Sequence, residues 1–129
     1  MKGVITDSHF RARDRLGRLL VFMARILQDQ GVDQVKGIGI DERTAVLVDP
    51  SGQAQVAGAG SAYFLRATHK PEVCRPGAPL TFRGVEERET RAGDRFDLLS
   101  WTGKGGTGSF LTAESASVRS YPGRAGGVQ

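Results

Sequence analysis

Residues 16–31 read LGRLLVFMARILQDQG, and this stretch sets the fold of the chain. Large apolar residues recur in it every three or four positions, which is the spacing of one face of an α-helix. These positions are Leu16, Leu19, Leu20, Met23, Ile26 and Leu27. Gly31 follows them and can adopt the left-handed conformation that often ends a helix. The pattern predicts a helix that packs one side on a core and stops at Gly31.

Upstream of this helix, residues 3–6 predict the end of a short strand because Val4 and Ile5 are β-branched. The polar residues that follow can cap the helix, since their side-chain oxygens accept hydrogen bonds from its unpaired N–H groups. The candidates for this cap are Thr6, Asp7 and Ser8.

Downstream of the helix, the β-branched stretches 35–40 and 44–48 predict two strands with Asp41-Glu42-Arg43 between them. Shorter strands are expected at 54–56, 62–65 and 80–82, with a tight turn or bulge at 58–61. Residues 86–89 form a charged stretch, 91–95 a turn, 96–101 a segment that closes an edge of the sheet, and 102–108 a mobile glycine-rich loop. A disordered tail is expected at 121–129.

Size and composition fit one globular domain, which we expect to cover residues 1–120. The chain has 129 residues, of which 39% are hydrophobic and 25% charged, the balance of an ordinary soluble protein. No apolar run is long enough to span a membrane, and the N-terminus lacks the apolar centre of a signal peptide. Cys74 is the single cysteine, which excludes an internal disulfide and a multi-cysteine zinc site. A reducing, cytoplasmic setting is therefore expected.

Positive charge is concentrated near the N-terminus. Residues 1–30 contain six basic and three acidic side chains, whereas the rest of the chain contains twelve and eleven. A local excess of this kind suits an anionic ligand better than nucleic acid bound across a broad surface.

A polar motif joins the first predicted strand to the helix. Asp7-Ser8-His9-Phe10 is followed by Arg13, Arg15 and Arg18. An imidazole can take the proton of a hydroxyl nucleophile, and guanidinium groups bind carboxylates in bidentate fashion. Taken alone, a single histidine here is more often a surface or capping residue, and an arginine run is more often a solvated helix face.

This motif resembles the pattern D-x-H-F-x-x-R-x-R-x-x-R-L of the cyanophycinases, a family of serine peptidases. The resemblance implies that His9 is the base of a Ser-His-Glu triad. It also implies that Arg13, Arg15 and Arg18 surround substrate carboxylates, with Asp7 and Ser8 in the same pocket. Ser8 stands where the family usually has glutamine. In this comparison the nucleophile, in a G-x-S-A-G turn, and the triad glutamate lie upstream of the histidine, so the chain resembles a C-terminal portion.

A second match carries the resemblance further along the chain. Residues 37–45 read GIGIDERTA, similar to the family pattern G-I-G-I-D-E-x-T-A. Asp41, Glu42 and Thr44 are candidate pocket residues, although the adjacency of the two acids within apolar strands also fits structural hydrogen bonding. The family's fold is a three-layer α/β/α sandwich resembling the class I glutamine amidotransferases. The chain would supply one main helix and mixed or antiparallel strands to this α/β fold.

The resemblance implies a serine-type exopeptidase that hydrolyses aspartate-backbone peptides of the β-aspartyl-arginine type, without a metal or other cofactor. The expected partners are a peptide with aspartate carboxylates and the upstream half of the domain, in the same or a separate chain; a homodimer is also compatible, and no membrane is expected. The chain alone is expected to be inactive, because its serine and triad glutamate would be absent. The alternative is a non-catalytic module whose basic helix docks an acidic partner or nucleic acid. An aromatic content of 7% offers few stacking platforms for single strands, so nucleic acid is the weaker alternative.

Overall fold

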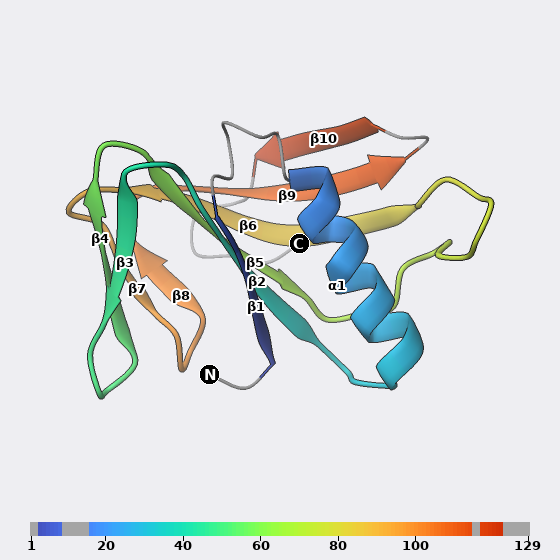
Figure 1. The fold of residues 1–129 in the computed structure, drawn as a ribbon, viewed down its shortest axis with the longest axis horizontal. Helices are drawn as coiled ribbons and strands as arrows, with labels where there is room; N and C mark the ends of the chain where they lie inside the picture. The colour runs from blue at the N-terminus through green and yellow to red at the C-terminus, as the bar shows by residue number, and fades with distance from the viewer. Residues whose placement is uncertain (1–2, 9–15, 115–116, 123–129) are drawn as a thin grey trace.

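The computed structural model of the chain describes residues 3–8, 16–114 and 117–122 (Figure 1). In chain order the elements are β1 (Val4–Ser8), α1 (Leu16–Gln30), β2 (Val35–Ile40), β3 (Thr44–Val48), β4 (Gln53–Gly58), β5 (Ser61–Ala67), β6 (Phe82–Arg91), β7 (Arg95–Asp97), β8 (Thr102–Lys104), β9 (Thr107–Glu114) and β10 (Ser117–Pro122).

The strands form two sheets. The larger has the order β1-β2-β5-β6-β9-β10, and the smaller has the order β3-β4-β7-β8. Strand β1 runs parallel to β2, whereas the other neighbours in the larger sheet are antiparallel. A parallel pair needs a crossover connection, which contains α1. The expected α/β class with one helix and mixed strands is confirmed.

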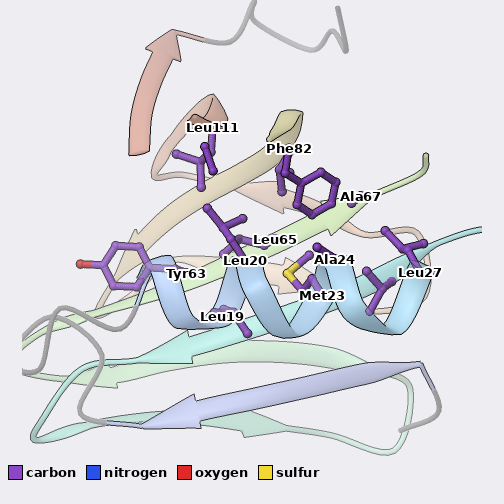
Figure 2. Packing of buried hydrophobic residues seen from close by; sticks show 13 residues of the cluster. Leu19, Leu20, Met23, Ala24, Leu27, Tyr63, Leu65, Ala67, Phe82 and Leu111 are labelled. Carbon is purple, nitrogen blue, oxygen red and sulfur yellow. The ribbon is translucent and has the colours of Figure 1, made fainter. Parts of the chain in front are cut away.

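Helix α1 lies on one face of the larger sheet, as Figures 1 and 2 show. The predicted stripe is confirmed: its central residues are fully buried, and Leu16 and Ile26 pack at its margin. The helix packs closely because β2 has a glycine beneath it; a Cβ on Gly37 would lie 3.0 Å from Met23 Sδ. Gly31, with φ of 65°, ends the helix as predicted.

The opposite face of the larger sheet packs against the smaller sheet. Ile38 of β2 and Phe64 of β5 point away from α1 and join Phe96 and Trp101 in a second buried cluster. The rings of Phe64 and Phe96 stack with centroids 4.1 Å apart. Among the described residues the layers are therefore helix, sheet and sheet, and a helical third layer is not seen in this part of the chain.

Agreement with the predicted elements is close up to β5 and poorer beyond it. Strand β1 extends to Ser8, so Asp7 is a strand residue. The charged stretch 86–89, to which the sequence assigned no strand, lies inside β6, a central strand of ten residues. The predicted loop 102–108 was wrong, because this segment contains β8 and the start of β9. Strand β10 includes Tyr121 and Pro122. No helix in the described part of the chain is long and apolar enough to cross a bilayer.

Candidate functional site

The candidate site lies at the edge of the sheet where the parallel strands β1 and β2 both end. Ser8, the last residue of β1, is in register with Ile40, the last residue of β2. The residues that come next in sequence are His9 after β1 and Asp41 after β2. Carboxyl ends of parallel strands are where open α/β sheets place their sites. His9, Arg13 and Arg15 lie outside the described residues.

Asp7 and Arg18 join β1 to α1 at this edge. Arg18 donates from Nε to Asp7 Oδ2 over 3.1 Å and from Nη2 to Asp7 Oδ1 over 2.5 Å. The Asp7 side chain is 7% exposed and that of Arg18 is 44% exposed. A bidentate guanidinium is the partner that a nearly buried carboxylate requires. The described role of Arg18 is therefore to neutralise Asp7, and a substrate carboxylate at Arg18 would share the guanidinium with it.

The basic surface of α1 is partly neutralised in the same way. Arg25 contacts Asp29 one turn further along the helix, with Nη2 2.8 Å from Oδ2. The described helical arginines thus each have an acidic partner. Arg11, Arg13 and Arg15, which carry the rest of the positive charge near the helix in sequence, lie outside the described residues.

Asp41 and Thr44 close a corner between the two sheets. Asp41 Oδ2 accepts a hydrogen bond from the backbone N–H of Ser61 at 3.0 Å, and Thr44 Oγ1 accepts one from the N–H of Gly60 at 2.9 Å. A Cβ on Gly60 would lie 2.7 Å from Thr44 Oγ1 and 2.8 Å from Asp41 Cβ. The structure thus gives Asp41 the structural hydrogen bonding that the sequence left open as an alternative, and Thr44 has a similar role. Glu42 is exposed between them.

Polar residues that the sequence did not point to extend this corner across the sheet. Tyr63 donates from its hydroxyl to Asp41 Oδ2 over 3.3 Å, and Ser61 Oγ donates to Glu89 Oε2 over 3.2 Å. The strand registers align Asp7, Gly39, Tyr63 and Glu89 in one row across β1, β2, β5 and β6. Asp7, Tyr63 and Glu89 are far apart in sequence, so only the strand pairing could have shown that they are aligned.

Comparison with known proteins agrees with the resemblance read from the motifs. The chain is similar to the proteins named cyanophycinase from Trichormus variabilis and from Nostoc sp., with 37% identity over 103 residues in each case. The match covers 77% of this chain and 33% of each relative, so the chain spans about a third of the length of these curated relatives. No protein-family model matches the chain.

Proposed function

We propose that the chain is the C-terminal portion of a cyanophycinase-like serine peptidase, in which His9 is the general base. The observation that carries this proposal is the parallel register of β1 and β2, which brings the last residues of the two strands, Ser8 and Ile40, to one sheet edge. The similarity to the two cyanophycinases supports it. In the complete domain, the upstream polypeptide would contribute the nucleophilic serine and the remaining layer of an α/β/α sandwich.

The proposed reaction needs a carboxylate to orient the imidazole, because a histidine takes the serine proton efficiently only in the correct tautomer and orientation. Asp41 and Glu42 follow β2 at the edge where His9 follows β1. Asp41 is half-buried and its Oδ2 is engaged by Ser61 and Tyr63. Glu42 is exposed at the same edge. We propose that the orienting carboxylate is the upstream glutamate that the family resemblance implies, and that Asp41 and Glu42 are pocket residues.

The proposed substrate is a peptide with an aspartate backbone, of the β-aspartyl-arginine type. Its carboxylates would bind Arg13 and Arg15, whose side chains supply forked donors, and would share Arg18 with Asp7. Ser8 would line the same pocket. His9 would accept the serine proton during attack and return it to the leaving amine. These steps require no metal or organic cofactor.

Reconstitution tests this proposal. The chain is co-expressed with the part of the Nostoc sp. cyanophycinase that precedes the matched stretch. Release of β-aspartyl-arginine is then measured from a poly-aspartate peptide that carries arginine on its side chains. The complex should hydrolyse the aspartate backbone of this peptide, and His9→Ala should lower the rate at least about 100-fold, the scale of general base catalysis. Arg25→Ala, which removes a surface charge paired with Asp29, is the matched control and should leave the rate unchanged.

Two results would refute the proposal. One is ordinary serine-peptidase turnover by the 129-residue chain alone, since this would place the nucleophile within it. The other is a reconstituted complex in which the His9→Ala variant is as active as the parent.

A further inference from the structure

Strand β3 forms one edge of the smaller sheet, and only one side of its backbone is paired within that sheet. The N–H of Ala59 donates to Arg43 O over 2.9 Å, which sets the alternation of hydrogen bonds between β3 and β4. In an antiparallel pair, every second residue bonds to the neighbouring strand and the residues between turn their backbone groups away. The odd-numbered residues of β3 therefore bond to β4, and the N–H and C=O groups of Val46 and Val48 point away from the sheet.

The side chains of this edge strand do not protect it against pairing. Edge strands usually carry lysine, proline or a bulge, or are very short. The opposite edge of the same sheet follows this rule, because β8 has three residues and contains Lys104. Strand β3 reads Thr-Ala-Val-Leu-Val, and its register with β4 runs without a bulge. Leu47 and Val48 are 58% and 47% exposed. An exposed apolar edge of this kind favours the addition of another strand.

Opposite charges lie at the two ends of β3. Arg43 precedes the strand, is exposed, and takes part in none of the ion pairs among the described residues. Asp49 follows the strand and is also exposed. The Ser51 hydroxyl and the N–H groups of Ser51 and Gln53 all donate to Asp49 Oδ1, which leaves Oδ2 for a partner outside this turn. The strand thus has a cation at its start and an anion at its end.

We propose that β3 pairs in the antiparallel sense with β3 of a second copy of this chain, an inference that goes beyond the proposed function and does not depend on it. A two-fold axis beside Val46 pairs all five residues of both strands. The same register places Arg43 of each copy opposite Asp49 of the other, and Leu47 opposite Ala45. Both are non-hydrogen-bonded pairs, in which facing side chains approach most closely.

The charges favour this register over a shifted one. A shift of one strand by two residues would place Asp49 opposite either Asp41 or Ala45 of the other copy, and the pairing with Arg43 would be lost. Two strands of five residues bury less area than the ~1,200 Å² of a standard interface. The dimer should therefore be weak, with a dissociation constant in the micromolar to millimolar range.

Sedimentation and amide hydrogen exchange of the 129-residue chain test this pairing together. Dimers should form as the concentration rises. Because protection follows the dimer fraction, exchange of the Val46 N–H should slow at least about fivefold once most of the protein is dimeric. A chain that stays monomeric at millimolar concentration would overturn the inference. Dimers in which Val46 still exchanges at the rate of the monomer would also overturn it, since they would form through another surface.

A lysine at an exposed position of the strand provides a second test. Leu47→Lys should weaken the dimer at least about tenfold, because a charge then enters the new contact. The fold should be kept, because the Leu47 side chain is exposed. The matched control is Val21→Lys on the exposed side of α1, which lies far from β3 in Figure 1. Weakening by both variants, or by neither, would contradict the proposal.

A pair of charge reversals tests the register. Arg43→Asp and Asp49→Arg each place like charges opposite one another at both ends of the paired strands. Each variant should therefore be monomeric at a concentration where the parent is dimeric, with circular dichroism showing that it is folded. An equal mixture of the two should associate again, because it restores opposite charges at both ends. Folded variants that fail to associate in the mixture would overturn the register.

The upstream part of the Nostoc sp. cyanophycinase distinguishes a second copy from another occupant of this edge. With that part bound, the proposal predicts a complex that contains two copies of the chain and in which Val46 stays protected. A complex with one copy and a protected Val46 would assign the edge to the upstream polypeptide and overturn the inference. Peptide turnover does not enter this measurement, so failure of the proposed function would leave the strand pairing intact.

Discussion

At the scale of single residues, the chain surrounds its candidate site with carboxylates that are held by specific donors. Asp7 has a guanidinium, and Asp41 has a backbone N–H and a phenol. These partners fix the side chains before any ligand arrives, so much of the motif serves the fold as well as the proposed chemistry.

The Asp7–Arg18 pair should contribute measurably to stability. Arg18→Met leaves the nearly buried Asp7 without its described guanidinium and should lower the free energy of unfolding by about 1–3 kcal/mol, less than for a fully buried pair because Arg18 is partly exposed. A double-mutant cycle with Asp7→Asn, followed by urea unfolding, should give a coupling of at least about 1 kcal/mol. The exposed Arg25–Asp29 pair is the control, with about 0.3–0.5 kcal/mol expected. Equal coupling in both pairs would contradict this role.

Two exposed turns should make stability depend on pH. Hydrogen bonds from the Ser51 hydroxyl and from backbone N–H groups lower the pKa of Asp49, and the N–H groups of Leu99 and Ser100 lower the pKa of Asp97. A lowered folded-state pKa stabilises the protein above the unfolded value of about 3.9 and ceases to do so as pH falls through the folded value.

We therefore expect the variants Asp49→Asn and Asp97→Asn to melt at lower temperature than the parent at neutral pH. The gap should begin to narrow as the pH falls below about 4 and should close only below the lowered folded-state pKa, where the parent carboxylates are protonated in the folded protein as well. Thermal unfolding followed by circular dichroism across this range is the measurement. A gap that stays constant with pH would show that the charge of these carboxylates is not what stabilises the turns.

The sequence could identify site residues but not their partners. Asp7, Arg18, Asp41 and Thr44 stand in local motifs that a single sequence displays. Tyr63 and Glu89 do not, because the contact of Tyr63 with Asp41 and that of Glu89 with Ser61 follow from the pairing of β2, β5 and β6. Pairing between strands that are far apart in sequence cannot be predicted from the residue pattern of any one segment.

At the scale of secondary structure, the packing of α1 on β2 is the contact that positions the site. Gly37 lies beneath the helix, and a Cβ there would be 3.0 Å from Met23 Sδ and 3.3 Å from Leu19 Cδ1. The first glycine of the GIGIDE segment is thus explained by close approach of a helix to a strand.

Gly37→Val should therefore push α1 away from β2 and destabilise the chain by about 1–3 kcal/mol, the usual cost of overpacking a core. Urea unfolding monitored by circular dichroism measures this change. Gly17→Ala is the control, since a Cβ there meets nothing within 4 Å and a helical alanine replaces a glycine at a gain of up to about 1 kcal/mol. Unchanged stability of the Gly37→Val variant would show that the contact between α1 and β2 can accommodate a larger side chain.

The same scale explains which elements could be predicted. Helix α1 and strands β2 to β5 have clear apolar periodicity and turn residues between them. Strand β6 was missed because its interior carries Glu86, Glu87, Arg88 and Glu89. These charges are tolerated in a central strand because they find partners, such as Arg66 for Glu86 and Ser109 for Glu87. Strand β8 and the start of β9 were missed for a different reason: residues 102–108 are rich in glycine, which is typical of loops.

At the scale of the whole molecule, the described residues form a six-stranded mixed sheet that packs against α1 on one face and against the smaller sheet on the other. The register at the end of β1 and the partial similarity to the two cyanophycinases support the proposal of a catalytic centre that this chain shares with upstream polypeptide.

The most direct measurement is covalent labelling of the serine that His9 is proposed to activate. A fluorophosphonate reacts with a serine hydroxyl only when a neighbouring base removes its proton. We predict that the complex with the upstream part of the Nostoc sp. cyanophycinase is labelled on one serine of that part, and that His9→Ala slows labelling at least about 100-fold while Arg25→Ala leaves it unchanged. Labelling at the same rate in the His9→Ala complex would contradict the account.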